Sequence, residues 1–293
     1  MENLAKADWD DPQRVKGLID SYTERYGEVF WSALLHVLGS RRRDTVVELG
    51  CGPGLFLVDA VGRLGSSFVY GLDASQEMLA RARDFLRQVL PEDRFRLVRV
   101  DFDTESISVG SPGADLCFAG YLLHEVANPV GLLTQTAALL RPEGACAVFD
   151  FVSGDEEGFV KAMVGRGVSE EHARRRYPHM CKHSLEDLTD VFSRSGYASI
   201  SHVLADGFRA IVVGVRSRSQ RVEASSVSNT HSSRRSSPWA HDDSEVKCPS
   251  CQSTKVFRVL DRWALSRGVQ VFQCTSCGRK FYERGVDDYQ PTF

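Results

Sequence analysis

The stretch VVELGCGPG, residues 46–54, is the most informative part of the sequence. It starts with apolar residues typical of a buried strand and ends with Gly50, Gly52 and Gly54. Because glycine has no side chain, a loop of this kind between a strand and a helix lets the backbone approach a ligand closely. A nicotinamide dinucleotide fingerprint would need a further glycine where this sequence has Leu55, so the pattern disfavours a dinucleotide.

Strand and helix patterns alternate after this loop. Apolar runs predict strands at residues 45–49, 67–72, 95–100, 114–119 and 145–152. Helical spacing of apolar residues predicts helices at residues 15–38, 55–64, 78–90, 130–140 and 185–195. A closing hairpin is expected at residues 197–204 and 208–216. Repeated strand-helix-strand units predict an α/β fold, with a parallel sheet covered by helices on both faces.

The composition divides the chain into four parts. We expect an N-terminal helical segment at residues 1–44 and an α/β domain at residues 45–217, with an insertion at residues 154–183 on the substrate side. Residues 218–244 are rich in Ser, Arg and Asn, which predicts a flexible linker before a small domain at residues 245–285.

The overall composition limits the partners of the protein. The chain has 293 residues, 42% hydrophobic, with 36 Lys and Arg against 39 Asp and Glu, so its formal charge of -3 provides no global attraction for nucleic acid or anionic lipid. We find no uncharged apolar stretch of the roughly 18 residues that a membrane span needs, and no signal-peptide pattern at the start. We therefore expect a cytoplasmic protein with no membrane partner.

Acidic and aromatic residues follow the predicted strands. Asp73 ends the second strand about twenty residues after the glycine loop, where a carboxylate can accept both hydroxyls of a ribose. Asp101 and Phe102 follow the third strand, and all these strand ends meet at one edge of a parallel sheet. Taken singly, Asp73 could instead cap a helix and Asp101 could be a solvated turn residue.

These motifs resemble those of the class I S-adenosylmethionine-dependent methyltransferases. The resemblance covers about residues 15–216 and is carried by ELGCGPG (48–54), GLDAS (71–75), Asp101-Phe102 and LLRPEG (139–144). It implies a Rossmann-like sheet of seven strands in which the last strand is antiparallel, and S-adenosylmethionine as cofactor. The cofactor-binding residues that it implies are Glu48, Gly50, Cys51, Gly52, Gly54, Asp73, Ala74, Met78, Asp101, Phe102 and Ala119.

Within that resemblance each residue type has an expected role. The glycines would shape the pocket for the methionine part, Glu48 would lie near its amino group, Asp73 would hold the ribose, and Asp101 with Phe102 would frame the adenine. His124, after the fourth strand, is the candidate general base, because a histidine can titrate near neutrality. The alternative is that His124 only packs in the turn that follows.

The acceptor is expected to be a small molecule. The α/β domain shows no extended basic surface and no Asn-Pro-Pro-Tyr-type motif. Tyr22 and Tyr26 are candidates for a lid over the substrate. Two other functions stay open: a non-catalytic cofactor-binding interaction protein, and a methyltransferase of RNA or protein that binds its substrate through the C-terminal domain.

The C-terminal domain carries two C-x-x-C pairs, Cys248 with Cys251 and Cys274 with Cys277, with 22 residues between the pairs. Four thiolates at this spacing suit a tetrahedral zinc site, and the segment resembles a zinc ribbon. Redox dithiols or a disulfide are the alternative. Residues 246–284 hold eight Lys and Arg against two acidic residues, so the ribbon could bind nucleic acid or a protein partner, or simply have a solvated basic face.

Overall fold

The structure is a computed structural model, and it describes residues 9–39, 41–109, 112–216, 247–253, 256–259, 271–274 and 280–282. The chain divides into two compact units, Met1–Arg218 and Ser219–Phe293. The first unit contains the predicted α/β domain, and the second contains the paired cysteines.

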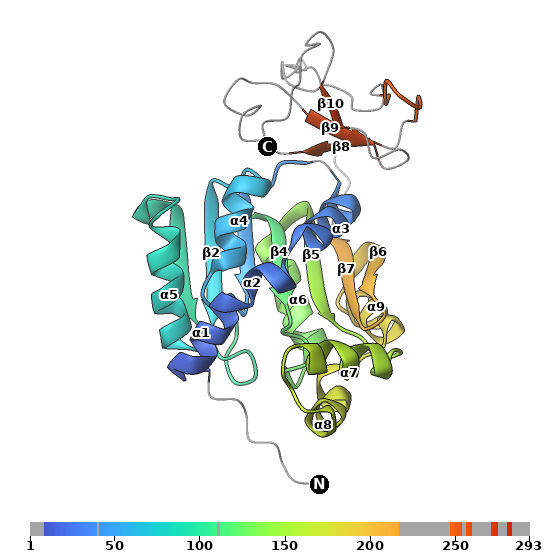
Figure 1. The fold of residues 1–293 in the computed structure, drawn as a ribbon. Coiled ribbons are helices and arrows are strands. Elements are labelled where there is room, and N and C mark those ends of the chain that lie inside the picture. The colour runs from blue at the N-terminus through green and yellow to red at the C-terminus, as the bar shows by residue number, and fades with distance from the viewer. Residues whose placement is uncertain are drawn as a thin grey trace, which may run out of the picture. The chain divides into compact units, whose positions relative to one another are not determined.

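Seven strands of the described part of the first unit form one sheet in the order β3-β2-β1-β4-β5-β7-β6 (Figure 1). Strand β7 runs antiparallel to both of its neighbours, β5 and β6, whereas β1 to β5 pair in parallel. The expected Rossmann-like sheet with an antiparallel last strand is therefore confirmed. The strands are β1 (Thr45–Leu49), β2 (Phe68–Asp73), β3 (Phe95–Arg99), β4 (Ala114–Gly120), β5 (Leu140–Phe151), β6 (Tyr197–Asp206) and β7 (Arg209–Arg216).

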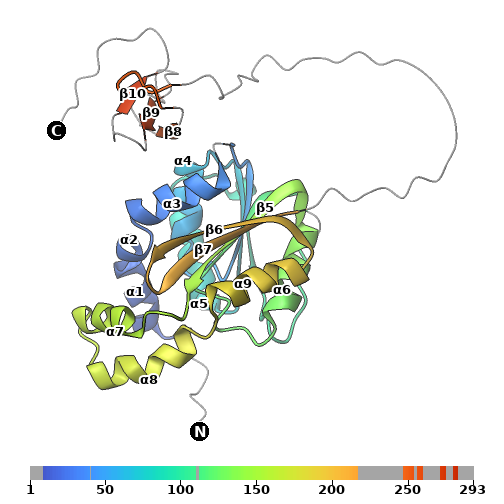
Figure 2. The ribbon, with the colours of Figure 1, turned by 90° about the vertical axis from the view of Figure 1, so that its right-hand side faces the viewer.

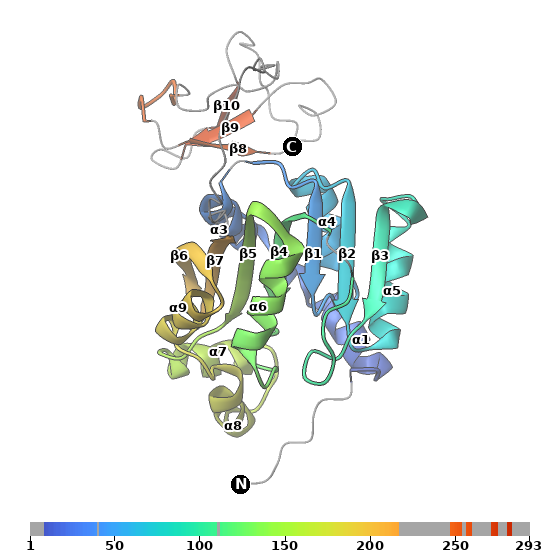
Figure 3. The same ribbon diagram turned by 180° about the vertical axis from the view of Figure 1, so that it is seen from behind.

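Helices cover both faces of this sheet, as Figures 2 and 3 show from the side and from behind. One face carries α3, α4 and α5, and the other carries α6 and α9. None of the described helices is long and apolar enough to cross a membrane. The helices are α1 (Pro12–Asp20), α2 (Tyr22–Arg25), α3 (Glu28–Leu38), α4 (Leu55–Arg63), α5 (Gln76–Leu86), η1 (Glu92–Arg94), α6 (Pro129–Leu139), α7 (Glu156–Gly165), α8 (Glu170–Met180) and α9 (Leu185–Arg194).

Alternate residues of the central strands build two separate cores. Val46 packs with the α3-α4-α5 layer, and its neighbour Val47 packs with the α6-α9 layer. In β5, Ala147 and Val148 divide in the same way. Since successive side chains of a strand point to opposite faces, a strand buried on both faces must be apolar throughout. This constraint explains the nearly uninterrupted apolar runs in the sequence.

Helix α5 ends earlier than its apolar stripe suggests. It stops at Leu86, and the amides of Val89 and Leu90 both donate to the Leu86 carbonyl, at 3.0 and 2.8 Å, in a tighter turn. Pro91 follows, and a proline disfavours helical backbone at the residue before it. Val89 and Leu90, the last residues of the apolar stripe, therefore lie in a turn that follows the helix.

Strand β5 starts earlier than the sequence suggests. Leu140 is already extended and pairs with Ala114, but the next pair is Leu116 with Ala145, so the register shifts between them. Glu143 has a φ of +65° within the shift. A bulge of this kind absorbs the extra residues without breaking the ladder.

The insertion at residues 154–183 folds as α7 and α8 over a small core of its own. Phe159 and Met163 of α7 pack there with Phe151 at the end of β5 and with Phe208. Helix α8 contains three consecutive arginines, Arg174–Arg176. Their charge is partly neutralised, because Arg174 pairs with Glu157 at 2.7 Å and with Glu156 and Glu170 on the exposed surface.

The described strands of the second unit form an antiparallel sheet in the order β10-β9-β8. These strands are β8 (Val256–Val259), β9 (Val271–Cys274) and β10 (Lys280–Tyr282). Cys248 opens a turn in which its carbonyl accepts the amide of Gln252 at 2.8 Å. Cys277 and the predicted linker at residues 218–244 lie outside the described residues.

Gly54 is predicted to be essential for the packing of α4 against α5. Its φ is +75°, and a Cβ added there would lie 2.8 Å from the Ala82 Cβ. Gly54→Ala should lower the free energy of unfolding by about 1–3 kcal/mol, measured by denaturant titration. Gly62→Ala in α4 is the matched control, because it has no neighbour within 4 Å and should stabilise by about 0.5–1 kcal/mol. Equal effects of the two substitutions would contradict this role of Gly54.

Candidate active site

A cavity opens at the edge of the sheet where β1, β2 and β4 end. Its wall includes residues from the glycine loop, from the ends of β2 and β4, and from α1 and α2. Gly54 and Ala119, also expected at the cofactor, do not line the cavity in this structure. The other cofactor-binding residues expected from the sequence all line it: Glu48, Gly50, Cys51, Gly52, Asp73, Ala74, Met78, Asp101 and Phe102.

The Asp73 carboxylate joins two loops of this cavity. Its Oδ2 accepts the Gly52 amide at 2.7 Å, and its Oδ1 accepts the Ser75 amide at 2.9 Å. Burial raises the pKa of Asp73, against hydrogen bonds from Ser75 and Gly52 that lower it. Each carboxylate oxygen can accept a second hydrogen bond, so Asp73 can still receive the hydroxyls of a ribose. The hydrogen bond that Asp73 accepts at the start of α5 is therefore compatible with its expected role at the cofactor. The N-cap of α5 is Ser75 and not Asp73.

Glu48 is a buried carboxylate, and one of its oxygens accepts no hydrogen bond from the described part of the chain. It is 3% exposed, and its Oε2 has no hydrogen-bond partner in the described part of the chain. Burial, then the charge of Asp73, raises the pKa of Glu48 well above its usual value, while Arg25 lowers it. A buried carboxylate without a donor is costly unless a ligand supplies one. An ammonium group at the end of β1 would satisfy this oxygen, so the residues present fit the methionine amino group of the cofactor.

Cys51 and Asp101 complete this side of the cavity. The Cys51 amide donates to the Leu72 carbonyl at 3.0 Å, and burial raises the pKa of its thiol well above the usual value, so the thiol stays protonated and is no nucleophile. Asp101 lines the cavity and also accepts the Asp103 amide at 3.1 Å in a tight turn.

The cavity contains residues that the cofactor motifs did not indicate. Trp9, Arg25, Tyr121 and Glu125 line it together with the two expected lid residues, Tyr22 and Tyr26. The Trp9 carbonyl accepts from the Ser75 hydroxyl at 3.1 Å, which attaches the N-terminal segment to the start of α5. The only sequence signals were the aromatic-rich run YTERY (22–26) and the position of Tyr121 directly after a strand end.

His124 lies behind the cavity and not in its wall. It is bonded to Asp150 twice, through Nδ1 to Oδ1 at 2.6 Å and through its amide to Oδ2 at 3.1 Å. Asp150 is 1% exposed. On the other side, His124 Nε2 is 3.3 Å from the carboxylate of Glu125, which does line the cavity.

The two carboxylates determine the charge of His124. Burial lowers its pKa, but the charge and hydrogen bond of Asp150, with those of Glu125, outweigh burial and raise the pKa to about 10. At neutral pH the ring is therefore an imidazolium held between two anions. The sequence predicted a base that titrates near neutrality. In the structure, the two carboxylates beside His124 favour the form in which both ring nitrogens are protonated.

Comparison with known proteins agrees with this geometry. Residues 46–144 match the family described as "Methyltransferase domain". The trans-aconitate 2-methyltransferase of Delftia acidovorans is 37% identical over 103 residues, covering 35% of this chain and 36% of that protein. The enzyme of the same name from Azoarcus sp. is 32% identical over 142 residues, covering 48% and 49%. The chain thus spans half or less of the curated relatives it matches.

A solved structure shares the fold. The S-adenosylmethionine-dependent methyltransferase from Aquifex aeolicus superposes with a TM-score of 0.52 at 18% identity, over 70% of this chain and 98% of that chain. The matched sheet, the glycine loop and the family match together identify residues 46–144 as a class I S-adenosylmethionine-dependent methyltransferase domain.

Two histidines are predicted to differ in charge at neutral pH. His124 should be protonated up to about pH 9, because of its Asp150 and Glu125 partners. His183 should be neutral at about pH 7.5, because burial, then the charge of Lys182, lowers its pKa. The ring nitrogen chemical shifts of both residues, followed by NMR between about pH 5 and pH 10, measure this directly.

The raised pKa also predicts a dependence of stability on pH. A histidine whose pKa is higher in the folded state stabilises most fully below its unfolded value of about 6.5, and that contribution is lost as the pH rises towards 10. Asp150→Asn should return the His124 transition towards the ordinary range and remove this dependence. A His124 ring that titrates near pH 6.5 in the unchanged protein would contradict the assignment.

Proposed function

We propose that this protein transfers the methyl group of S-adenosylmethionine to a small molecule that carries a carboxylate. The unpartnered Oε2 of buried Glu48, at the end of β1 beside the glycine loop and Asp73, is the observation that supports the cofactor. The two curated relatives described above are named trans-aconitate 2-methyltransferases, which supports an organic acid as acceptor. The roles expected for the individual site residues are part of this proposal.

The chemistry needs little from the chain beyond positioning. Bound S-adenosylmethionine supplies a methyl group on a sulfonium, which an acceptor lone pair can take while the broken carbon–sulfur bond leaves its electrons on sulfur. A carboxylate acceptor has already lost its proton at neutral pH, so no base is required. His124, held as an imidazolium, then serves to fix the Asp150 and Glu125 carboxylates. Orientation of two bound reactants can itself contribute up to about 7–11 kcal/mol.

In this proposal the aromatic residues beside the cavity exclude water and orient the bound reactants. Tyr26 is 7% exposed and its ring contacts Phe30 and Tyr121 edge-on. Tyr22 is held by a hydrogen bond of 2.8 Å from its hydroxyl to Asp59 on α4. In this proposal the α1-α2 segment therefore acts as a fixed lid over the cofactor, fastened to α4 and α5.

The ribbon is proposed separately as a zinc-binding recognition or docking module. The antiparallel β8-β9-β10 sheet, the turn that holds Cys248 and Cys251, and the position of Cys274 at the end of β9 support it. Within the described residues, no group of three or more potential ligands gathers. The boundaries at residues 44, 217 and 244, and a nucleic-acid or protein partner for the ribbon, stay predictions.

The proposed activity is tested with labelled cofactor. We expect the full chain to bind S-adenosylhomocysteine in calorimetry and to transfer labelled methyl groups from S-adenosylmethionine to trans-aconitate or to another small polycarboxylate of a test panel. Glu48→Gln should weaken S-adenosylhomocysteine binding by about 1.5–3 kcal/mol, because the ammonium loses a charged partner. Binding of 5′-methylthioadenosine, which has no ammonium, should be unchanged and serves as the control.

Two results would change the assignment. Binding without transfer to any small molecule would favour a non-catalytic cofactor-binding protein. Label found in RNA or protein instead would favour a macromolecule methyltransferase.

The metal proposal predicts a defined stoichiometry. Native mass spectrometry of the full chain should show about one zinc ion, bound by Cys248, Cys251, Cys274 and Cys277. A chain ending at residue 217 should contain none and should bind S-adenosylhomocysteine like the full chain. Stoichiometric zinc in the shortened chain, or a full chain without zinc but with four reactive thiols, would overturn the ribbon proposal.

A further inference from the structure

The lining of the cavity has an uneven charge. Its described carboxylates belong to Glu48, Asp73, Asp101, Asp103 and Glu125. Arg25 is the single Lys or Arg among the described lining residues. A cavity rich in carboxylates attracts a sulfonium and an ammonium, whereas any anionic group that enters it must find its counter-charge at Arg25.

Arg25 is held in place by contacts that leave part of its hydrogen-bonding capacity unused. Its Nη2 donates to the Leu18 carbonyl at 2.8 Å. Its Nε is buried and has no hydrogen-bond partner in the described part of the chain. A buried guanidinium N–H without an acceptor is costly, which makes this group a site for an external acceptor.

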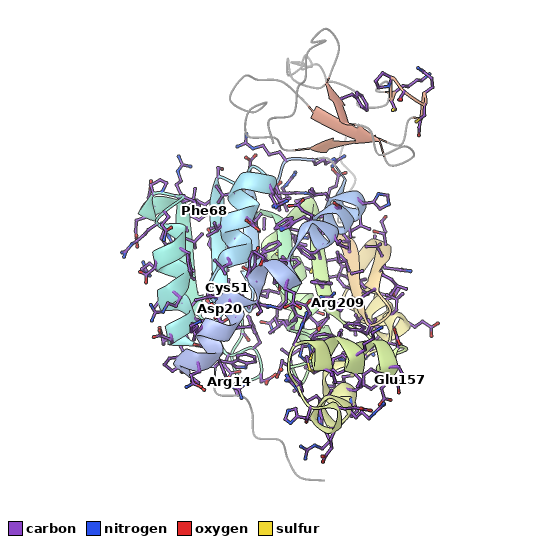
Figure 4. All side chains as sticks on the ribbon, in the orientation of Figure 1. Arg14, Asp20, Cys51, Phe68, Glu157 and Arg209 are labelled. Carbon is purple, nitrogen blue, oxygen red and sulfur yellow. The ribbon has the colours of Figure 1, made fainter. Side chains whose placement is uncertain are left out.

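Two aromatic rings fix the orientation of this guanidinium. Its Cζ lies 5.3 Å from the ring centre of Tyr26 and 5.8 Å from that of Tyr121. Tyr121 itself is fixed from behind, because Arg209 of β7 donates to its hydroxyl at 3.2 Å. Arg209 and Cys51 lie on either side of α2 in the view of Figure 4.

The backbone at Tyr121 adds to this rigidity. Tyr121 adopts a φ of +55°, which is uncommon for a non-glycine residue, and its amide donates to the Phe149 carbonyl at 2.7 Å. Strain of this kind persists where the surrounding contacts enforce it, and it is frequent at binding sites. Arg25 therefore faces a preorganised wall.

We propose that Arg25 is the carboxylate-binding residue of this cavity, with the rings of Tyr26 and Tyr121 as its support. This inference rests on the proposed function and adds the anionic group that the site recognises. A carboxylate could come from the methionine part of the cofactor, whose ammonium is assigned to nearby Glu48, or from the acceptor. A guanidinium suits either, since its fork of N–H groups matches the two oxygens of a carboxylate.

Calorimetry with Arg25→Gln in the full chain tests the inference and separates the two sources. If the cofactor supplies the carboxylate, S-adenosylhomocysteine should bind about 10-fold or more weakly, while 5′-methylthioadenosine, which has no carboxylate, binds as before. If the acceptor supplies it, S-adenosylhomocysteine binding should be unchanged, and trans-aconitate should bind the S-adenosylhomocysteine complex about 10-fold or more weakly. Arg81→Gln, an exposed arginine on α5 outside the cavity, is the matched control and should change neither affinity.

Two results would overturn the inference. One is an unchanged affinity for both S-adenosylhomocysteine and trans-aconitate. The other is a loss of 5′-methylthioadenosine binding in Arg25→Gln, which would assign the side chain to the fold. Because these measurements require no turnover, a failure of methyl transfer is distinguishable from a failure of the Arg25 assignment.

Discussion

The half-buried carboxylate of Asp73 holds together the backbone around the cavity. By accepting amides from Gly52 and Ser75, it keeps the loop after β1 and the start of α5 in one geometry. The loop can take that geometry because Gly50, Gly52 and Gly54 all have positive φ. A single side chain therefore orders two segments of the backbone that lines the cavity.

The glycine loop and Asp73 lie at one edge of the sheet because both faces of the sheet are covered by apolar cores. Strands β1 and β4 are buried on both faces, so neither face is left for a ligand, and the open edge at their carboxyl ends is where polar side chains can gather. The N-terminal helices close this edge. Their attachment depends on the hydrogen bonds of Tyr22 to Asp59 and of Ser75 to Trp9.

The charged side chains His124 and Arg25 are each held by neighbouring groups. The imidazolium of His124 lies between Asp150 and Glu125, and it pairs with the Glu125 carboxylate in the cavity wall. Arg25 opposes the acidic lining, with Tyr26 and Tyr121 against its guanidinium. This arrangement is consistent with a reaction in which orientation dominates and in which the acceptor brings no proton to be removed.

Local patterns in the sequence were enough to predict the glycine loop and the buried strands. They also predicted the helix at residues 185–195, and in the structure Ser184 and Asp187 form a capping box at its start. Which distant residues meet in the cavity depends instead on the folded sheet. Gly120 pairs with Phe149 across β4 and β5, and this register brings His124 to Asp150, whose charge and hydrogen bond raise the pKa of the predicted base. Trp9 and Arg25 reach the cavity through long-range packing, which no periodicity of the chain encodes, because a local pattern reports burial and not the identity of the neighbour.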